Sequence, residues 1–259
     1  INFMSIFKLS LKIIGQIIFV IIFFSTSQAR SLDKFNEAGR ISDYFSGILL
    51  LNDNQYTESS KFLKKLNGLE KSHNNYSVKY LYSAINSGNF KEAFNYSRKL
   101  EKQKLDSFES HLITGIFFLK NSNLDLAKKY FLKAKNKDSR FVLNNYVSNS
   151  LYNWSNLSNL DINSASLELK KLDKRFENLK RIQNVFLHCH YNRPNTNNLF
   201  KELTTNNRNA DFSRYNYFHA SYAFSLGKIN EAKNIIQLAL KVYPRNLLLN
   251  QYKIDLNEA

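Results

Sequence analysis

The sequence predicts an all-α repeat protein, and three observations support this fold class. Residues around Ser59, Ala93 and Ala127 recur with a step of 34 residues. The 259-residue chain contains 7 glycines and 2 prolines, so breaks in helices are few. Hydrophobic residues make up 43% of the chain, which is enough to build a core between stacked helices. A period of this length is typical of a helix–turn–helix unit that buries its apolar face against its neighbours.

The first 29 residues predict a secretory signal peptide. Lys8 and Lys12 precede an uncharged apolar stretch over residues 13–24, and small residues follow up to Ala29. This stretch is shorter than the roughly 20 residues needed to span a bilayer, so we expect cleavage after Ala29 and a bacterial periplasmic location. The alternative is an uncleaved segment that anchors the chain in the inner membrane. Residues 30–39 are expected to form a linker.

Four columns of residues share the 34-residue step over residues 40–139, the first three predicted units. Small side chains in such columns let two helix axes approach closely, and larger side chains three or four positions away fill the adjacent groove. The columns are Gly47, Leu81 and Gly115; Asn54, Gly88 and Ser122; Ser59, Ala93 and Ala127; and Leu66, Leu100 and Ala134.

The pattern weakens over residues 140–209 and returns over 210–245. Ala165 follows Ala127 by 38 residues and Leu199 follows Ala165 by 34, so we expect two degenerate units there. Residues 246–259 predict one further helix, which is either a cap or the start of another unit.

These motifs resemble those of the tetratricopeptide repeat family. The resemblance rests on Gly115–Phe118 (GIFF), Ala127–Ala134 (AKKYFLKA), Gly88–Ala93 (GNFKEA), Asn54–Ser59 (NQYTES), and Gly227–Ala232 (GKINEA) with Ile236, Ala239 and Pro244 after it. It implies a right-handed superhelical solenoid of antiparallel helix pairs, with about six units.

The resemblance also implies that the first helix of each unit lines a concave groove. The inward positions expected from the helical register are Tyr44, Ile48 and Leu51; Val78, Tyr82 and Ile85; Leu112, Ile116 and Leu119; and Tyr217, Ser221 and Phe224. Family members that bind C-terminal carboxylates carry Lys and Asn where Tyr44 and Ile48 stand, which argues against a carboxylate clamp. An apolar groove favours an amphipathic helix or extended segment of a partner protein. The alternative is that part of this set belongs to the core between helices.

The chain is basic, with a formal net charge of +16. Without residues 1–29 it keeps 35 basic and 21 acidic residues, a net charge of +14. Basic residues gather on the predicted second helices, which the resemblance places on the convex side: Lys61, Lys64, Lys65, Arg98, Lys99, Lys102, Lys128, Lys129, Lys133, Lys170, Lys171, Lys174 and Arg175. Compositional bias accounts for this charge, and attraction to an anionic membrane surface or another polyanion is the alternative. No motif for nucleic-acid recognition accompanies it.

The sequence predicts no catalytic residue, cofactor or metal site. His188, Cys189 and His190 are consecutive in an expected helix over residues 181–191, where successive side chains point about 100° apart and cannot converge on one ion. Cys189 is the single cysteine, so an internal disulfide is excluded. The sequence thus predicts a non-enzymatic, exported adaptor or scaffold that binds a partner protein or peptide in its groove, with a role in envelope assembly. The alternative function is a peripheral membrane or polyanion-binding protein with a basic convex face.

Overall fold

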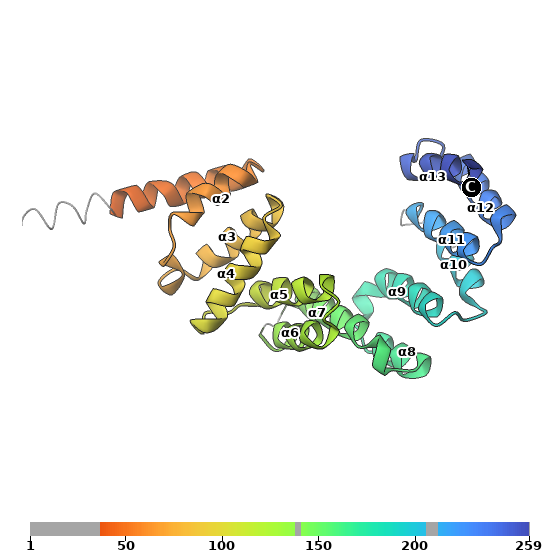
Figure 1. Ribbon diagram of the computed structural model, residues 1–259, viewed down its shortest axis with the longest axis horizontal. Coiled ribbons are helices and arrows are strands. Elements are labelled where there is room, and N and C mark those ends of the chain that lie inside the picture. The colour runs from red at the N-terminus through yellow and green to blue at the C-terminus, as the bar shows by residue number, and fades with distance from the viewer. Residues whose placement is uncertain (1–36, 138–140, 206–211, 259) are drawn as a thin grey trace, which may run out of the picture. The chain divides into compact units, whose positions relative to one another are not determined.

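The computed structural model describes residues 37–137, 141–205 and 212–258, and every regular element in these ranges is a helix. The predicted all-α class is therefore confirmed. A helix over residues 37–52 comes first. The elements that follow, most of them labelled in Figure 1, are α2 (Tyr56–Lys64), η1 (Leu69–Lys71), α3 (Asn74–Asn86), α4 (Phe90–Lys102), α5 (Phe108–Lys120), α6 (Leu124–Lys137), α7 (Val142–Ser155), η2 (Leu157–Asn159), α8 (Ile162–Lys170), η3 (Lys174–Phe176), α9 (Glu177–His190), α10 (Thr196–Thr205), α11 (Arg214–Ser225), α12 (Ile229–Val242) and α13 (Leu247–Glu258).

The described residues form two compact units that divide within α5, after Thr114. The N-terminal unit has a core of leucine and tyrosine side chains from α2, α3 and α4. The C-terminal unit buries three successive clusters, which lie among α7, α8 and α9, among α9, α10 and α11, and among α11, α12 and α13. The helices in these clusters therefore share their core with their neighbours in sequence, as a repeat array requires.

The glycines of the repeat mark points where two helices nearly touch. A Cβ atom on Gly47 would lie 2.7 Å from Leu63 Cδ2, and one on Gly115 would lie 2.5 Å from Phe131 Cε1. Ser59 Oγ donates a hydrogen bond of 2.8 Å to the Gly47 carbonyl oxygen, so the buried hydroxyl is satisfied. The columns thus encode helix crossings, which a larger side chain would push apart.

Each second helix carries its small residue at its fourth position. Four alanines and Ser59 occupy this position and are buried; the alanines are Ala93, Ala127, Ala165 and Ala232. Leu199 occupies the same position in α10 and is half-buried. A leucine in place of the small residue explains why the sequence pattern is weak in the fifth pair.

Left-handed backbone conformations end the first helices. Positive φ angles of 60°, 80°, 58°, 49° and 75° occur at Asn54, Gly88, Ser122, Asn192 and Gly227. Such a residue closes a helix C-terminus by satisfying its last carbonyl groups, and glycine and asparagine adopt the conformation most readily. The turn after α7 contains η2 instead. This longer connection accounts for the 38-residue step between Ala127 and Ala165.

The linker predicted over residues 30–39 ends earlier than expected, because residues 37–39 already belong to the first described helix. Glu37, Ala38 and Arg40 favour helix, and one intervening glycine does not break it. The terminal helix predicted over 246–259 corresponds to α13, which packs on α11 and α12. The predicted signal peptide lies outside the described residues. Among the helices that are described, none combines the length and the apolar character that membrane crossing demands.

Candidate functional site

A cleft of about 740 Å³ opens in the N-terminal unit. Its walls come from the end of α2 and from α4, and side chains of α3 and α4 supply its floor. We call it the lysine–tyrosine cleft after six of its lining residues: Lys64, Tyr76, Tyr80, Lys91, Tyr96 and Lys99. The amides Asn67, Asn89 and Asn95 lie on its exposed rim.

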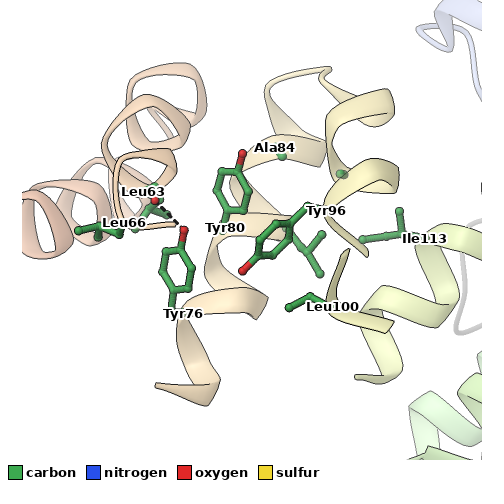
Figure 2. Packing of buried hydrophobic residues seen from close by; sticks show 10 residues of the cluster. Leu63, Leu66, Tyr76, Tyr80, Ala84, Tyr96, Leu100 and Ile113 are labelled. Carbon is green, nitrogen blue, oxygen red and sulfur yellow. Dashed lines mark hydrogen bonds between the residues drawn. The ribbon is translucent and has the colours of Figure 1, made fainter. Parts of the chain in front are cut away.

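Three buried tyrosines form the floor of the cleft. The rings of Tyr80 and Tyr96 meet edge to face at 4.8 Å, and Tyr76 lies parallel to Tyr80 at 6.1 Å. Figure 2 shows the three rings between α2 and Ile113, with the Tyr76 hydroxyl donating to the Leu63 carbonyl oxygen at 2.8 Å. Burial raises the pKa of each tyrosine above its usual value. The floor is therefore a neutral, rigid aromatic surface.

Ion pairs hold two of the three lysines that line the cleft, Lys64 and Lys99. Lys64 Nζ lies 2.7 Å from Glu92 Oε1, which also accepts a hydrogen bond of 2.6 Å from the Tyr80 hydroxyl. These bonds from Lys64 and Tyr80 lower the pKa of Glu92. The Glu92 carboxylate therefore stays ionised and fixes one ammonium group at the edge of the cleft.

The second ion pair is more deeply buried. Lys99 Nζ lies 2.5 Å from Glu70 Oε1, and the Gly68 N–H donates to Glu70 Oε2 at 2.7 Å. Burial by itself would raise the pKa of Glu70, but the bonds from Lys99 and the backbone outweigh it, so the pKa lies below its usual value. Removal of Lys99 would leave a buried charge without its partner, which is strongly destabilising.

Solved structures resemble this arrangement of helices, although no family model and no curated protein matches the chain. The apo form of the quorum sensor NprR from B. thuringiensis matches with a TM-score of 0.58 and 11% identity over 84% of this chain and 68% of its own. NprR in complex with its cognate peptide NprX matches with a TM-score of 0.53 and 12% identity over 84% of this chain and 71% of its own.

The C-terminal part of a TPR repeat-containing protein from Cytophaga hutchinsonii matches with a TM-score of 0.51 and 11% identity, over 77% of this chain and 78% of its own. The chain has the tetratricopeptide repeat (TPR) fold. The predicted resemblance and the predicted helical repeat solenoid are confirmed at the level of the fold. The Cut9–Hcn1 structure also matches, with a TM-score of 0.54 and 10% identity over 84% of this chain, which spans 42% of the matched chain's length.

The residues expected to line the groove differ in exposure. Tyr82 and Phe224 are exposed, at 52% and 38%, whereas Leu51 belongs to the core. The others are half-buried: Tyr44, Ile48, Val78, Ile85, Leu112, Ile116, Leu119 and Tyr217. These residues therefore serve partly as core, and the sequence could not separate the two roles.

Tyr44 and Tyr217 illustrate this sharing. Tyr44 packs against the N-terminal core, and its hydroxyl lies 2.7 Å from His73 Nε2. Tyr217 packs against the core of the last helix pair and meets Tyr252 edge to face at 4.7 Å. Substitution of either side chain would therefore disturb the fold as well as a groove. Tyr82 is the better probe of the groove.

Several lysines expected to form a basic face are engaged in ion pairs. Lys61 pairs with Glu58 and Lys171 with Glu168, each within one helix. Lys64 and Lys99 belong to the lysine–tyrosine cleft, where the carboxylates neutralise part of their charge. The predicted basic face is therefore interrupted by acidic side chains in the N-terminal unit.

The His188–His190 segment lies at the end of α9. Burial raises the pKa of the half-buried Cys189 thiol, which disfavours the reactive thiolate. No group of three or more His, Cys, Asp or Glu side chains in the described ranges is placed to hold a metal ion.

The sequence analysis missed the lysine–tyrosine cleft. Tyr76 and Tyr80 are spaced four apart and so share one helical face, which is a usable signal for an aromatic surface. Glu70 carried no such signal, because it lies in the short η1 helix and reaches Lys99 across 29 positions of sequence.

Proposed function

We propose that this chain is a non-enzymatic TPR scaffold that captures a segment of a partner protein on the apolar face of its first helices. The main observation behind this proposal is a set of apolar side chains that recur at 34-residue steps on the first helices, which we call the ladder. Its members in the N-terminal unit are Tyr44, Val78 and Leu112; Ile48 and Tyr82; and Ile85. The NprR structure with its cognate peptide supports peptide capture by this fold.

The chemistry of the ladder favours an apolar stripe on the partner. Tyr82 is exposed, and its ring meets Tyr56 edge to face at 6.0 Å, so it offers a fixed aromatic surface. Burial of such a side chain contributes about 1.5–3 kcal/mol to binding. An amphipathic helix or an extended segment with alternating apolar residues would cover the ladder.

A pair of charge substitutions tests this function. We expect Tyr82→Glu to reduce capture of partner proteins by the immobilised full chain, because it places a charge on the apolar face. Leu167→Glu is the matched control, since Leu167 in α8 is also exposed, at 56%, and lies outside the ladder. Captured proteins are quantified by mass spectrometry, and helical content is followed by circular dichroism.

Equal capture by wild type and the Tyr82→Glu variant would contradict the proposal. Sedimentation with anionic vesicles that is lost at high salt, combined with unaltered capture, would instead favour the membrane-surface function.

We further propose that the chain is exported and acts in the bacterial envelope. The support is the order of Lys8 and Lys12, an apolar stretch over 13–24, and small residues up to Ala29. N-terminal sequencing of the protein recovered from the periplasm should begin at Arg30. Recovery from the cytosol with residues 4–29 attached would contradict export.

A further inference from the structure

We propose that the lysine–tyrosine cleft is a second binding site, separate from the ladder, and that it takes an extended segment of acidic peptide. The cleft is built from side chains of α2, α3 and α4, all of which belong to the N-terminal unit. Peptide binding in the cleft does not require that the ladder also binds a partner.

Helical geometry separates the two sites. At about 100° per residue, Tyr76 and Tyr80 lie on one side of α3, and Val78, Tyr82 and Ile85 lie on the opposite side. The first set forms the floor of the cleft, whereas the second set belongs to the ladder. One α3 helix can therefore face two ligands at once.

The size and lining of the cleft fit a peptide. Its volume of about 740 Å³ lies in the usual range for ligand sites. Asn67 accepts a hydrogen bond from Lys99 Nζ, and Asn89 donates one to Ser87 Oγ. Asn67 therefore keeps its N–H donors, Asn89 keeps its oxygen acceptor, and Asn95 offers both to the alternating groups of a peptide backbone. The buried tyrosine rings beneath them offer apolar contact.

The charges of the cleft select for carboxylates. An ammonium group has three donors, and Lys64 makes one ion pair, with Glu92, so donors remain for a ligand. Lys91 lines the same cleft and is exposed, and within the described ranges no ion pair to it is found. The net charge of +16 adds attraction for an acidic segment.

The carboxylate of Glu92, which lines the cleft, argues against a nucleic-acid strand. Glu92 is held ionised by Lys64 and Tyr80, and it would repel a backbone with a phosphate at every residue. An acidic peptide can place its carboxylates beside the lysines and a neutral residue beside Glu92. Peptide is therefore the ligand class that the cleft favours.

Fluorescence anisotropy with the full chain tests this site. The probe is a labelled ten-residue peptide with four glutamates and a central leucine, and its comparison peptide has glutamine in place of each glutamate. We expect tighter binding of the acidic peptide, and a loss of about fivefold in affinity for Lys91→Glu. Lys102→Glu is the matched control, because Lys102 is exposed on the same helix and does not line the cleft. It should change affinity by less than about twofold.

A second variant tests occupancy of the cleft without a change of charge. Asn95→Trp would place an indole in the opening, and Asn95 is exposed on α4, so the core is left intact. We expect this variant to lose binding of the acidic peptide. Equal losses for Lys91→Glu and Lys102→Glu, equal binding of the glutamine peptide, or unaltered binding by Asn95→Trp would overturn the proposal. Tighter, Lys91-dependent binding of a single-stranded oligonucleotide or of anionic vesicles would overturn it in favour of a polyanion site.

Discussion

The second helix pair, α3 with α4, and the last pair, α11 with α12, share one register but fill it with different side chains. Twelve residues before the small residue of the second helix stand Leu81 in one pair and Ala220 in the other. Four residues after it stand Ser97 and Ile236. All four side chains are buried. The larger side chain stands on the first helix in the second pair and on the second helix in the last pair, so the two crossings keep a similar summed side-chain volume with different residue types.

The two pairs also differ in how a buried polar side chain of the first helix, Tyr80 or His219, is connected to a glutamate of the second helix. A glutamate directly precedes the small residue in both, as Glu92 and Glu231. The Tyr80 hydroxyl donates directly to Glu92 at 2.6 Å. In the last pair, His219 Nε2 bonds Asn197 Oδ1, and the Asn197 amide donates to Glu231 Oε1 at 2.9 Å. The repeat therefore fixes positions, while the partners at each position are chosen locally.

We expect the largest effect when a larger side chain is introduced into the last pair and the side chain that it faces is not made smaller. Ala220→Leu should lower the free energy of unfolding by more than about 3 kcal/mol, because the crossing already holds Ile236. The double variant Ala220→Leu with Ile236→Ser copies the second pair and should regain part of that loss. Urea denaturation of the three proteins measures both effects. A double variant that is less stable than Ala220→Leu alone would contradict the idea that the two positions can exchange a large and a small side chain.

Removing volume from the second pair should have the next largest effect. Leu81→Ala leaves a cavity beside a serine that cannot fill it, and should cost about 3 kcal/mol in urea denaturation. Leu132→Ala on α6 is the control, since Leu132 is exposed and its loss should cost less than about 1 kcal/mol. Equal costs for the two variants would show that Leu81 does not fill the crossing.

Because a histidine in the unfolded chain titrates near neutral pH and a tyrosine does not, the last pair should lose stability in mild acid and the second pair should not. Burial lowers the pKa of His219 to about 4, with Glu231 opposing and Lys201 reinforcing the shift. The unfolded chain therefore binds the proton more readily, and between pH 7 and pH 5 the last pair should lose about 2 kcal/mol of stability. Tyr80 does not titrate in this range. The protection factors for hydrogen exchange, which correct for slower intrinsic exchange at lower pH, should fall in α11 but not in α3, and His219→Gln should remove the difference. An equal fall of the protection factors in both helices would contradict the assignment.

The smallest effect concerns an unpartnered hydroxyl. Ser97 Oγ is buried, and no hydrogen-bond partner for it is found in the described part of the chain. Ser97→Ala should therefore raise the free energy of unfolding by about 1 kcal/mol. Ser83→Ala is the matched control, because Ser83 Oγ donates to the Tyr80 carbonyl oxygen at 2.9 Å and its loss should not stabilise. Destabilisation by Ser97→Ala, measured in urea, would indicate that the hydroxyl has a partner.

The helical repeat, its 34-residue step and the close crossings could be predicted from the sequence alone, because a small residue at a fixed interval is needed wherever two helices touch. Gly47, Gly115, Ala93, Ala127 and Ala232 could all be identified in this way. The 38-residue step was visible too, although its cause, the η2 turn, was not.

The division of the helix faces between core and surface depends on the packing of neighbouring helices and could not be predicted from the sequence. Leu51 and Tyr82 have the same predicted role, yet Leu51 is buried and Tyr82 is exposed, because burial depends on the neighbouring helices and not on the residue's own period. The lysine–tyrosine cleft likewise needed the structure. Its ion pairs join Lys64 to Glu92 and Lys99 to Glu70, and contacts between residues 28 and 29 positions apart arise from how helices stack, which no local pattern records.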